Sequence, residues 1–221
     1  MLEKMKGGLV VSCQALPHEP LHGSHHMAAM ARAAKESGAV GIRANGYEDI
    51  REIKSKIDLP MIGILKFNDP SYDAFITATK EHAKLVSDAG ADIIAVDATA
   101  RSRPVPFPEL VVYIKQTLGK LVMADVSTWE EGVEAERVGC DMVGTTLSGY
   151  TEATKHRTNP DFELIETLVN KLKVPVIAEG GIRTPEQAKR AIDLGAFFVV
   201  VGGAITRPQE ITARFVEGIK R

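Results

Sequence analysis

The sequence is poor in cysteine, with only Cys13 and Cys140 among its 221 residues. Two thiols cannot form the framework of several disulfides that holds small secreted domains together. Nothing in this pattern indicates an oxidising compartment, so we expect a cytoplasmic protein. Both cysteines are interpreted as small buried apolar residues rather than as nucleophiles.

Charge of one sign and long apolar runs are also lacking. A net charge of −2 offers no electrostatic attraction to nucleic acid or to a membrane surface. No apolar run approaches the roughly 18 residues that a membrane-spanning helix needs, and the apolar stretch near the N-terminus is too short for a signal peptide. We therefore expect no nucleic-acid partner and no membrane partner.

Short apolar runs alternate with longer amphipathic segments along the whole chain. Each run is rich in Val, Ile or Leu without polar alternation, which is typical of a strand buried on both faces. The predicted strands are 8–14, 39–45, 59–66, 91–98, 120–127, 141–148, 174–180 and 196–202. Helical patterns between them include 130–138, 163–172 and 185–194. Thr128 with Glu131, and Thr184 with Gln187, fit capping boxes at two helix starts.

A weak internal repeat favours a closed barrel. Gly38, Gly90, Gly139 and Gly195 each end a helical pattern and open a strand, at separations of 52, 49 and 56 residues. Glycine is expected there, because the residue after a helix is often left-handed. A doubly wound open sheet would instead place a Gly-rich loop after its first strand, where this chain has QALPHEPLH. The sequence thus predicts an α/β fold, with residues 1–221 forming a single (β/α)8 (TIM) barrel catalytic domain.

Polar residues follow the apolar strands at their carboxyl ends, where barrel enzymes build their active sites. These residues are Gln14, Arg43, Asn45, Lys66, Asp97, Thr99, Asp125, Thr145, Thr146 and Glu179. A charge at one strand end can simply surface into solvent, but five strands ending in a charge at the same face indicate a site. Lys66 and Glu179 lie at even offsets from Pro60 and Pro175, so both are predicted to point into the barrel mouth.

Two glycine pairs indicate a phosphate site at the C-terminal end of the barrel. Gly180-Gly181 and Gly202-Gly203 follow the last two predicted strands, where barrels commonly bind phosphate. Glycine allows backbone N–H groups to approach an anion closely. Arg207, just before Pro208, could add a bidentate contact. Each pair alone could be a tight turn, but together they favour phosphate binding.

A metal site is not expected. His18, His22, His25 and His26 lie close together in the sequence, but no carboxylate stands at ligand spacing. His25 and His26 cannot both face one point on a helix. We interpret this segment as a loop over the substrate.

The motifs SCQALPHEPLH, GIRANGYEDI, GILK, VDAT, MADVST, TTLSGYT, AEGGIRTPEQ and GGAITRPQEIT cover nearly the whole chain. With them the sequence resembles the bacterial N-acetylmannosamine-6-phosphate 2-epimerases. The resemblance implies conversion of N-acetylmannosamine 6-phosphate to N-acetylglucosamine 6-phosphate, without a cofactor, in the breakdown of sialic acids and amino sugars.

The resemblance also implies residue roles. Lys66 and Glu179 would be catalytic. The substrate-binding set would be Gln14, Arg43 and Asp125 for the sugar and its N-acetyl group, Gly181, Gly202, Gly203 and Arg207 for the phosphate, and Thr145. The family commonly has Lys-Arg where this chain has Lys66-Phe67, and often Ser-Ser-Phe where it has Gly23-Ser24-His25. Both departures could alter substrate approach.

Epimerisation at C2 requires an open-chain aldehyde, because only then is the C2 proton acidic. Lys66 is the preferred base, since desolvation and nearby Arg43 would lower the pKa of its ammonium group. Glu179 is open to three interpretations: the acid on the opposite face, a ring-opening group, or a partner that positions Lys66. A substrate oxygen could relay the second proton, and Lys66 could instead form a Schiff base.

Other functions and the assembly state stay open at this point. An aldolase or a metal-dependent ketose-phosphate epimerase would use the same fold, and a non-catalytic sugar-phosphate sensor would need no base. Homodimers are common among such barrels, so we expect a homodimer, and exchange of the final helix FVEGIKR between subunits is one way to form it.

Overall fold

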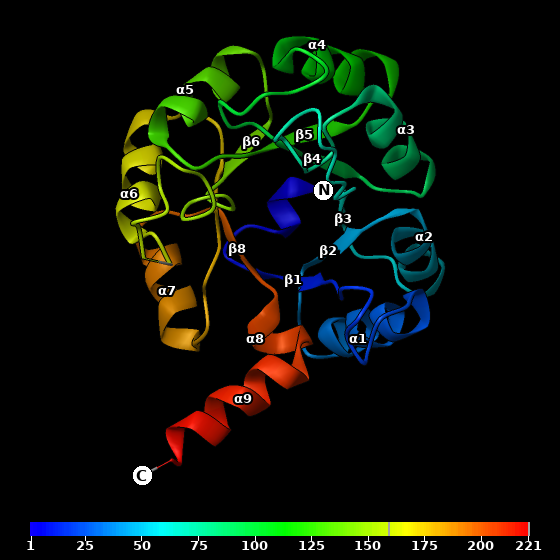
Figure 1. The fold of residues 1–221 in the computed structure, drawn as a ribbon, viewed down its shortest axis with the longest axis vertical. Helices are drawn as coiled ribbons and strands as arrows, with labels where there is room; N and C mark the ends of the chain where they lie inside the picture. The colour runs from blue at the N-terminus through cyan, green and yellow to red at the C-terminus, as the bar shows by residue number, and fades with distance from the viewer. Residues whose placement is uncertain (159, 221) are drawn as a thin grey trace.

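The computed structural model describes residues 1–158 and 160–220 and confirms the predicted barrel. Eight parallel strands close in sequence order, with helices around the outside (Figure 1). The strands are β1 Leu9–Cys13, β2 Gly41–Asn45, β3 Met61–Ile64, β4 Ile93–Asp97, β5 Leu121–Asp125, β6 Met142–Gly144, β7 Val176–Glu179 and β8 Phe198–Val201. Each strand lies within its predicted range.

The helices follow the strands in order. They are α1 Ser24–Glu36, α2 Tyr47–Lys56, α3 Lys80–Asp88, α4 Phe107–Val112 with the π-helical turn η2 Tyr113–Thr117, α5 Trp129–Arg137, α6 Phe162–Lys171, α7 Pro185–Asp193, α8 Gly203–Thr206 and α9 Pro208–Gly218. Both predicted capping boxes are present, at Thr128 of α5 and Thr184 of α7. Among the described residues, no helix combines the length and hydropathy that crossing a membrane requires.

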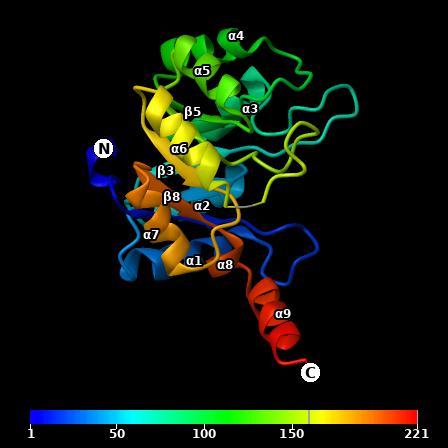
Figure 2. The same ribbon diagram turned by 90° about the vertical axis from the view of Figure 1, so that its left-hand side faces the viewer.

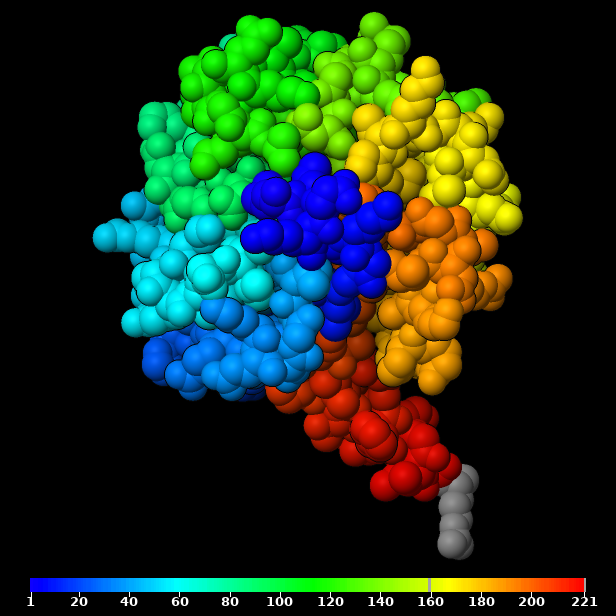
Figure 3. Space-filling model, turned by 180° about the vertical axis from the view of Figure 1, so that it is seen from behind, coloured from blue at the N-terminus to red at the C-terminus, as the bar shows by residue number. Residues whose placement is uncertain are grey.

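The polar groups of the barrel gather at one of its two ends, because the interior is packed and the other end is covered. Its interior is filled by apolar side chains from all the strands except β2, such as Val10, Ile62 and Phe198. The short 3-10 helix η1, Leu2–Lys4, is followed by fully buried Met5, and this segment lies across the amino end of the barrel (Figure 3). The long loops after the strands project from the opposite end (Figure 2). Polar residues at the carboxyl ends of the strands therefore meet in one mouth.

The predicted repeat has the expected backbone conformation. Gly38, Gly90, Gly139 and Gly195 have φ angles of 94°, 104°, 94° and 101°, in the left-handed region that favours glycine. Four times along the chain, the same turn thus ends a helix and leads into the next strand.

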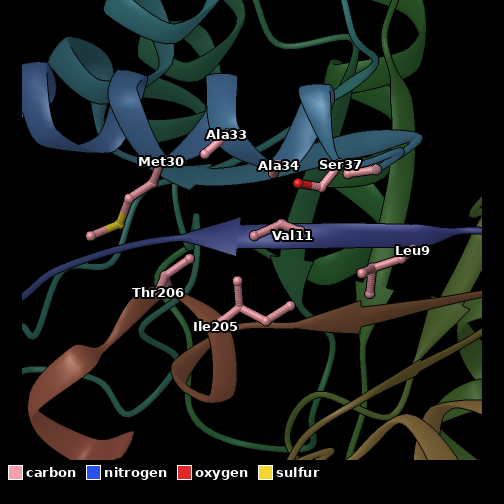
Figure 4. Close-up of a pocket in the computed structure, with 9 residues that line it drawn as sticks. Leu9, Val11, Met30, Ala33, Ala34, Ser37, Ile205 and Thr206 are labelled. Carbon is pink, nitrogen blue, oxygen red and sulfur yellow. The ribbon is translucent and has the colours of Figure 1, made fainter.

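The last βα unit departs from the regular pattern. The helix directly after β8 is the four-residue α8, and α9 extends away from the barrel with none of its residues buried (Figures 1 and 2). An apolar groove remains beside β1, between α1 and α8 (Figure 4). Its lining residues are Leu9, Val11, Met30, Ala33, Ala34, Ser37, Ala39, Ile205 and Thr206. In a regular (β/α)8 barrel a full-length helix would cover this face.

Packing between β3 and the helices leaves no room for a side chain at Gly63. A Cβ there would lie 2.5 Å from Val86 Cγ1 and 2.6 Å from Ala91 Cβ. We expect Gly63→Ala to lower the free energy of unfolding by about 1–3 kcal/mol, because the interface would be overpacked. Urea denaturation measures this. The control is Gly218→Ala, where a Cβ meets nothing within 4 Å; equal stability of the two variants would contradict the prediction.

Candidate active site

A buried ion network spans the barrel mouth. Arg43 on β2 makes two hydrogen bonds to Asp125 on β5, from Nη2 to Oδ2 at 2.6 Å and from Nη1 to Oδ1 at 3.1 Å. The same Nη1 donates to Glu179 Oε2 on β7 at 2.8 Å. The side chains of Arg43 and Asp125 are 1% and 0% exposed. One guanidinium group therefore joins three strands that are not neighbours in the sheet.

The network shifts the proton affinity of its members. Burial alone would lower the pKa of Arg43, but Asp125 and Glu179 raise it overall, so the guanidinium stays charged. Burial raises the pKa of Glu179 to about 7, with Asp125 adding to the rise, while Arg43 and Lys66 oppose it. Glu179 is thus a carboxyl group that can hold or release a proton near neutral pH.

Lys66 lies two residues beyond β3, at the parity that the sequence predicted. Its predecessors at even offsets, Ile62 and Ile64, point into the barrel interior. In the described parts of the chain its Nζ forms no hydrogen bond and no ion pair. The residue as a whole is exposed, yet the desolvation imposed by its surroundings, followed by the charge of Arg43, lowers the pKa of the ammonium group. Lys66 therefore has the direction of shift expected for a base.

Two threonines after β6 bind the residues of the ion network, Thr145 through the backbone of Glu179 and Thr146 through the carboxylate of Asp125. Thr145 Oγ1 donates to the Glu179 carbonyl at 2.9 Å and accepts from the Glu179 N–H at 3.1 Å. Thr146 Oγ1 donates to Asp125 Oδ1 at 2.6 Å. Thr145 was predicted to bind substrate, and in the structure its buried hydroxyl is engaged with the Glu179 backbone. Gln14, half-buried at the mouth, donates from Nε2 to Ser12 Oγ at 2.7 Å.

The predicted phosphate residues lie in the loops after β7 and β8. Gly180 and Gly181 have φ angles of 111° and 65°, which glycine adopts without strain. Gly202 precedes α8 and Gly203 is its first residue. Arg207 joins α8 to α9.

Arg207 forms ion pairs with two carboxylates that were not predicted from the sequence. Its Nη1 lies 2.8 Å from Glu210 Oε1, and its Nε lies 3.4 Å from Glu19 Oε1. The other oxygen of Glu210 lies 2.4 Å from the place where a Cβ of Gly203 would be. The Arg207–Glu210 pair follows from helical i,i+3 spacing, but the approach of Glu19 depends on how the loop after β1 folds. An anion entering here would compete with these carboxylates.

The loop between β3 and α3 also supports the site and was not singled out from the sequence. Thr77 is fully buried and has φ of 49°, a conformation rarely adopted by a β-branched residue and costing about 1–3 kcal/mol. Asn45 Oδ1 accepts from the Lys66 N–H at 2.8 Å. The apolar run AFITA, ending one residue past Thr77, was the available signal for this segment.

Among the residues that the structure describes, the histidines and cysteines form neither a metal-binding cluster nor a reactive thiol. Across residues 1–158 and 160–220, no three His, Cys, Asp or Glu side chains are placed to hold a metal ion. Burial raises the pKa of both Cys13 and Cys140 to about 12, so the thiols stay protonated. This fits their interpretation as buried apolar residues.

Comparison with known proteins shows the family to which the chain belongs. The family model described as "Putative N-acetylmannosamine-6-phosphate epimerase" matches residues 27–221. A relative of that description from Caldanaerobacter subterraneus subsp. tengcongensis is 53% identical, over 100% of this chain and 94% of the relative. The solved N-acetylmannosamine-6-phosphate 2-epimerase from Clostridium perfringens is 52% identical, with a TM-score of 0.96 over 99% of this chain and 96% of that chain. A thiamine phosphate pyrophosphorylase from Pyrococcus furiosus, 20% identical with a TM-score of 0.64, shares the fold alone. The resemblance seen in the motifs is confirmed, and the chain belongs to the N-acetylmannosamine-6-phosphate epimerase family.

Proposed function

We propose that the protein converts N-acetylmannosamine 6-phosphate to N-acetylglucosamine 6-phosphate by removing and returning the proton at C2. One observation carries this proposal beyond family membership. A lysine with a lowered pKa lies two residues beyond β3, and a carboxyl group with a raised pKa ends β7, on the opposite side of the barrel mouth. Such a pair can work on two faces of one carbon atom.

The charges in the mouth suggest how Lys66 and Glu179 share the two proton transfers. Asp125 offsets the charge of Arg43 through two hydrogen bonds. Lys66 and Glu179 then share one proton: neutral Lys66 with protonated Glu179, or the ammonium with the carboxylate. In the first form Lys66 takes the C2 proton of the open-chain sugar and Glu179 supplies a proton to the other face of the enolate. In the second form the same groups run the reaction backwards.

The phosphate end would be held by Arg207 and the glycine-rich turns after β7 and β8. The phosphate would take over Arg207 from Glu210 or Glu19, because a dianion competes well for a guanidinium group. Gln14 would contact the sugar. Epimerisation involves no change of oxidation state, so it requires no electron-carrying cofactor. We place the reaction in the cytoplasmic breakdown of sialic acids and amino sugars, in keeping with two unpaired, buried thiols.

The first test follows the reaction in D2O by proton NMR. We expect N-acetylmannosamine 6-phosphate to be converted to the gluco epimer with deuterium at C2, at a rate that a chelator leaves unchanged. Carbon–carbon cleavage products would favour an aldolase, and loss of activity with chelator would favour a metal-dependent epimerase. Unchanged substrate after long incubation would favour a sensor, and any of these three results would contradict the proposal.

The second test removes the proton-transfer groups. Lys66→Met and Glu179→Gln should each lower kcat by about 10²–10⁴-fold, the usual contribution of a positioned acid or base. Lys6→Met is the matched control, because Lys6 lies exposed at the other end of the barrel. If Lys66→Met keeps wild-type kcat, Lys66 is not the base.

The pH dependence of kcat/KM tests the shared proton. At low pH both groups are protonated and no base remains; at high pH both have lost their protons and no acid remains. Because the pKa of Glu179 is raised to about 7 and that of Lys66 is lowered, the two limbs should lie closer together than the ordinary pKa values of a carboxyl group and a lysine would place them. A profile that is flat across neutral pH would rule out the shared proton.

We also propose that the protein is a homodimer in which α9 of one copy covers the groove of the other. Ile211 and Phe215 on α9, and Ile219 at its C-cap, recur every fourth residue and form one stripe. Phe215 and Ile219 are 72% and 79% exposed, which is unusual for two large apolar side chains on the same face of a helix. The groove beside β1 is apolar and lacks a covering helix (Figure 4). Docking of the stripe of one copy in the groove of the other would bury both apolar surfaces.

Light scattering after size exclusion tests the dimer. The wild type should have twice the chain mass, and Phe215→Glu should be monomeric, because a carboxylate would enter the apolar contact. Ala213→Glu introduces the same charge on the opposite face of α9 and should stay dimeric. A monomeric wild type would contradict the proposed dimer.

A further inference from the structure

The mouth of the barrel is not regular between β3 and β4. The two strands pair only at Ile62 with Ile93 and at Gly63 with Ile94. Beyond that point residues 75–77, here called the strap, lie between the two strands. Ile76 forms an antiparallel bridge with Lys66, and its carbonyl accepts from the Asp97 N–H on β4 at 2.8 Å. On the side that faces β4, Lys66 is therefore held by the strap and not by that strand.

The strap binds the backbone on both sides of Lys66. The Phe67 N–H donates to the Phe75 carbonyl at 2.9 Å, and the Thr77 N–H donates to the Leu65 carbonyl at 2.8 Å. On the other flank, Asn45 at the end of β2 accepts the Lys66 N–H. Because Nζ itself has no partner in the described residues, its position depends on this backbone frame.

Thr77, the last residue of the strap, contributes both a side-chain hydrogen bond and a turn of the backbone. Its Oγ1 accepts from the Leu65 N–H at 3.1 Å, and its left-handed backbone turns the chain from the strap towards α3. Glycine would adopt this φ without strain but has no hydroxyl to satisfy the Leu65 amide. The strained threonine at this place is thus explained by the bond that it makes next to Lys66.

We propose that Thr77 is a positioning residue for Lys66: the bond from its hydroxyl to the Leu65 amide holds the backbone so that the lysine side chain enters the mouth. The kinetic consequence rests on the proposed function of Lys66 as base. The structural consequence, a fixed environment for the ammonium group, can be measured without turnover.

The variants separate the hydroxyl from the shape of the side chain. Thr77→Val keeps the shape and removes the acceptor, so kcat should fall about ten- to a hundredfold with little change in KM, the scale expected for a reacting group displaced by about 1 Å. Thr77→Ser restores the hydroxyl and should return kcat to near the wild-type value. Thr79→Ala is the control for stability, because Thr79 caps α3 through the His82 N–H, whereas the Leu65 N–H donates to Thr77.

The second readout is the pKa of Lys66, measured by ¹³C NMR of protein labelled at lysine Cε, with Lys66→Met for assignment. In Thr77→Val it should move up towards the ordinary lysine value, because the ammonium group leaves its desolvated place beside Arg43. In Thr77→Ser and Thr79→Ala it should stay lowered. If the pKa and kcat are unmoved in Thr77→Val, or if Thr79→Ala moves both equally, the inference fails. If the wild type shows no epimerisation at all, the proposed function fails, and the titration still decides the role of Thr77.

Discussion

The site depends on one buried cation. A guanidinium group removed from water costs several kcal/mol unless its surroundings replace the lost hydrogen bonds. Arg43 is retained because Asp125 and Glu179 accept from it across the barrel. The reverse also holds: without Arg43, two carboxylates would be left buried at the strand ends, and breaking such a pair costs about 3–5 kcal/mol. The shape of the mouth therefore depends on all three side chains, Arg43, Asp125 and Glu179, which ties folding of the barrel top to the chemistry there.

Arg43 also affects the pKa of Lys66 and of Glu179, the two groups that we propose transfer the proton. Asp125 takes two of its hydrogen bonds and Glu179 takes one. Glu179 is held less firmly, and burial can raise its pKa to about 7 even though Arg43 opposes the rise. The pKa of Lys66 is lowered by desolvation and then by the same cation. Burial thus moves the two pKa values towards each other, which favours proton exchange between them. A carboxylate near a lysine base raises the pKa of the ammonium group, and here the charge of Arg43 opposes that rise.

Local patterns made most of the fold predictable. Apolar runs, capping boxes at Thr128 and Thr184, and recurrent glycines depend on neighbours in the sequence, and the structure has them where they were predicted. Parity likewise indicated that Lys66 and Glu179 face the mouth. The pairing of Arg43 with Asp125 was not predictable in this way, because it joins residues 82 apart through the closure of the barrel. Thr77 was missed for a related reason: its left-handed turn is imposed by tertiary contacts, while its local sequence, AFITA, favours extended structure.

The two irregular parts of the barrel carry the two cations that would meet the substrate. Lys66 is placed by the strap between β3 and β4, and Arg207 by the junction where α8 gives way to α9. The carboxylates Asp125 and Glu179, in contrast, end regular strands. This division has a physical basis. Buried anions need fixed donors around them, and strand ends supply a rigid place. An arginine that must exchange its carboxylate partners for a phosphate, or a lysine that must reach an enolate, needs a segment whose position can be set separately. The strap and the junction between α8 and α9 are such segments. They position Lys66 and Arg207 independently of the strands that end in Asp125 and Glu179.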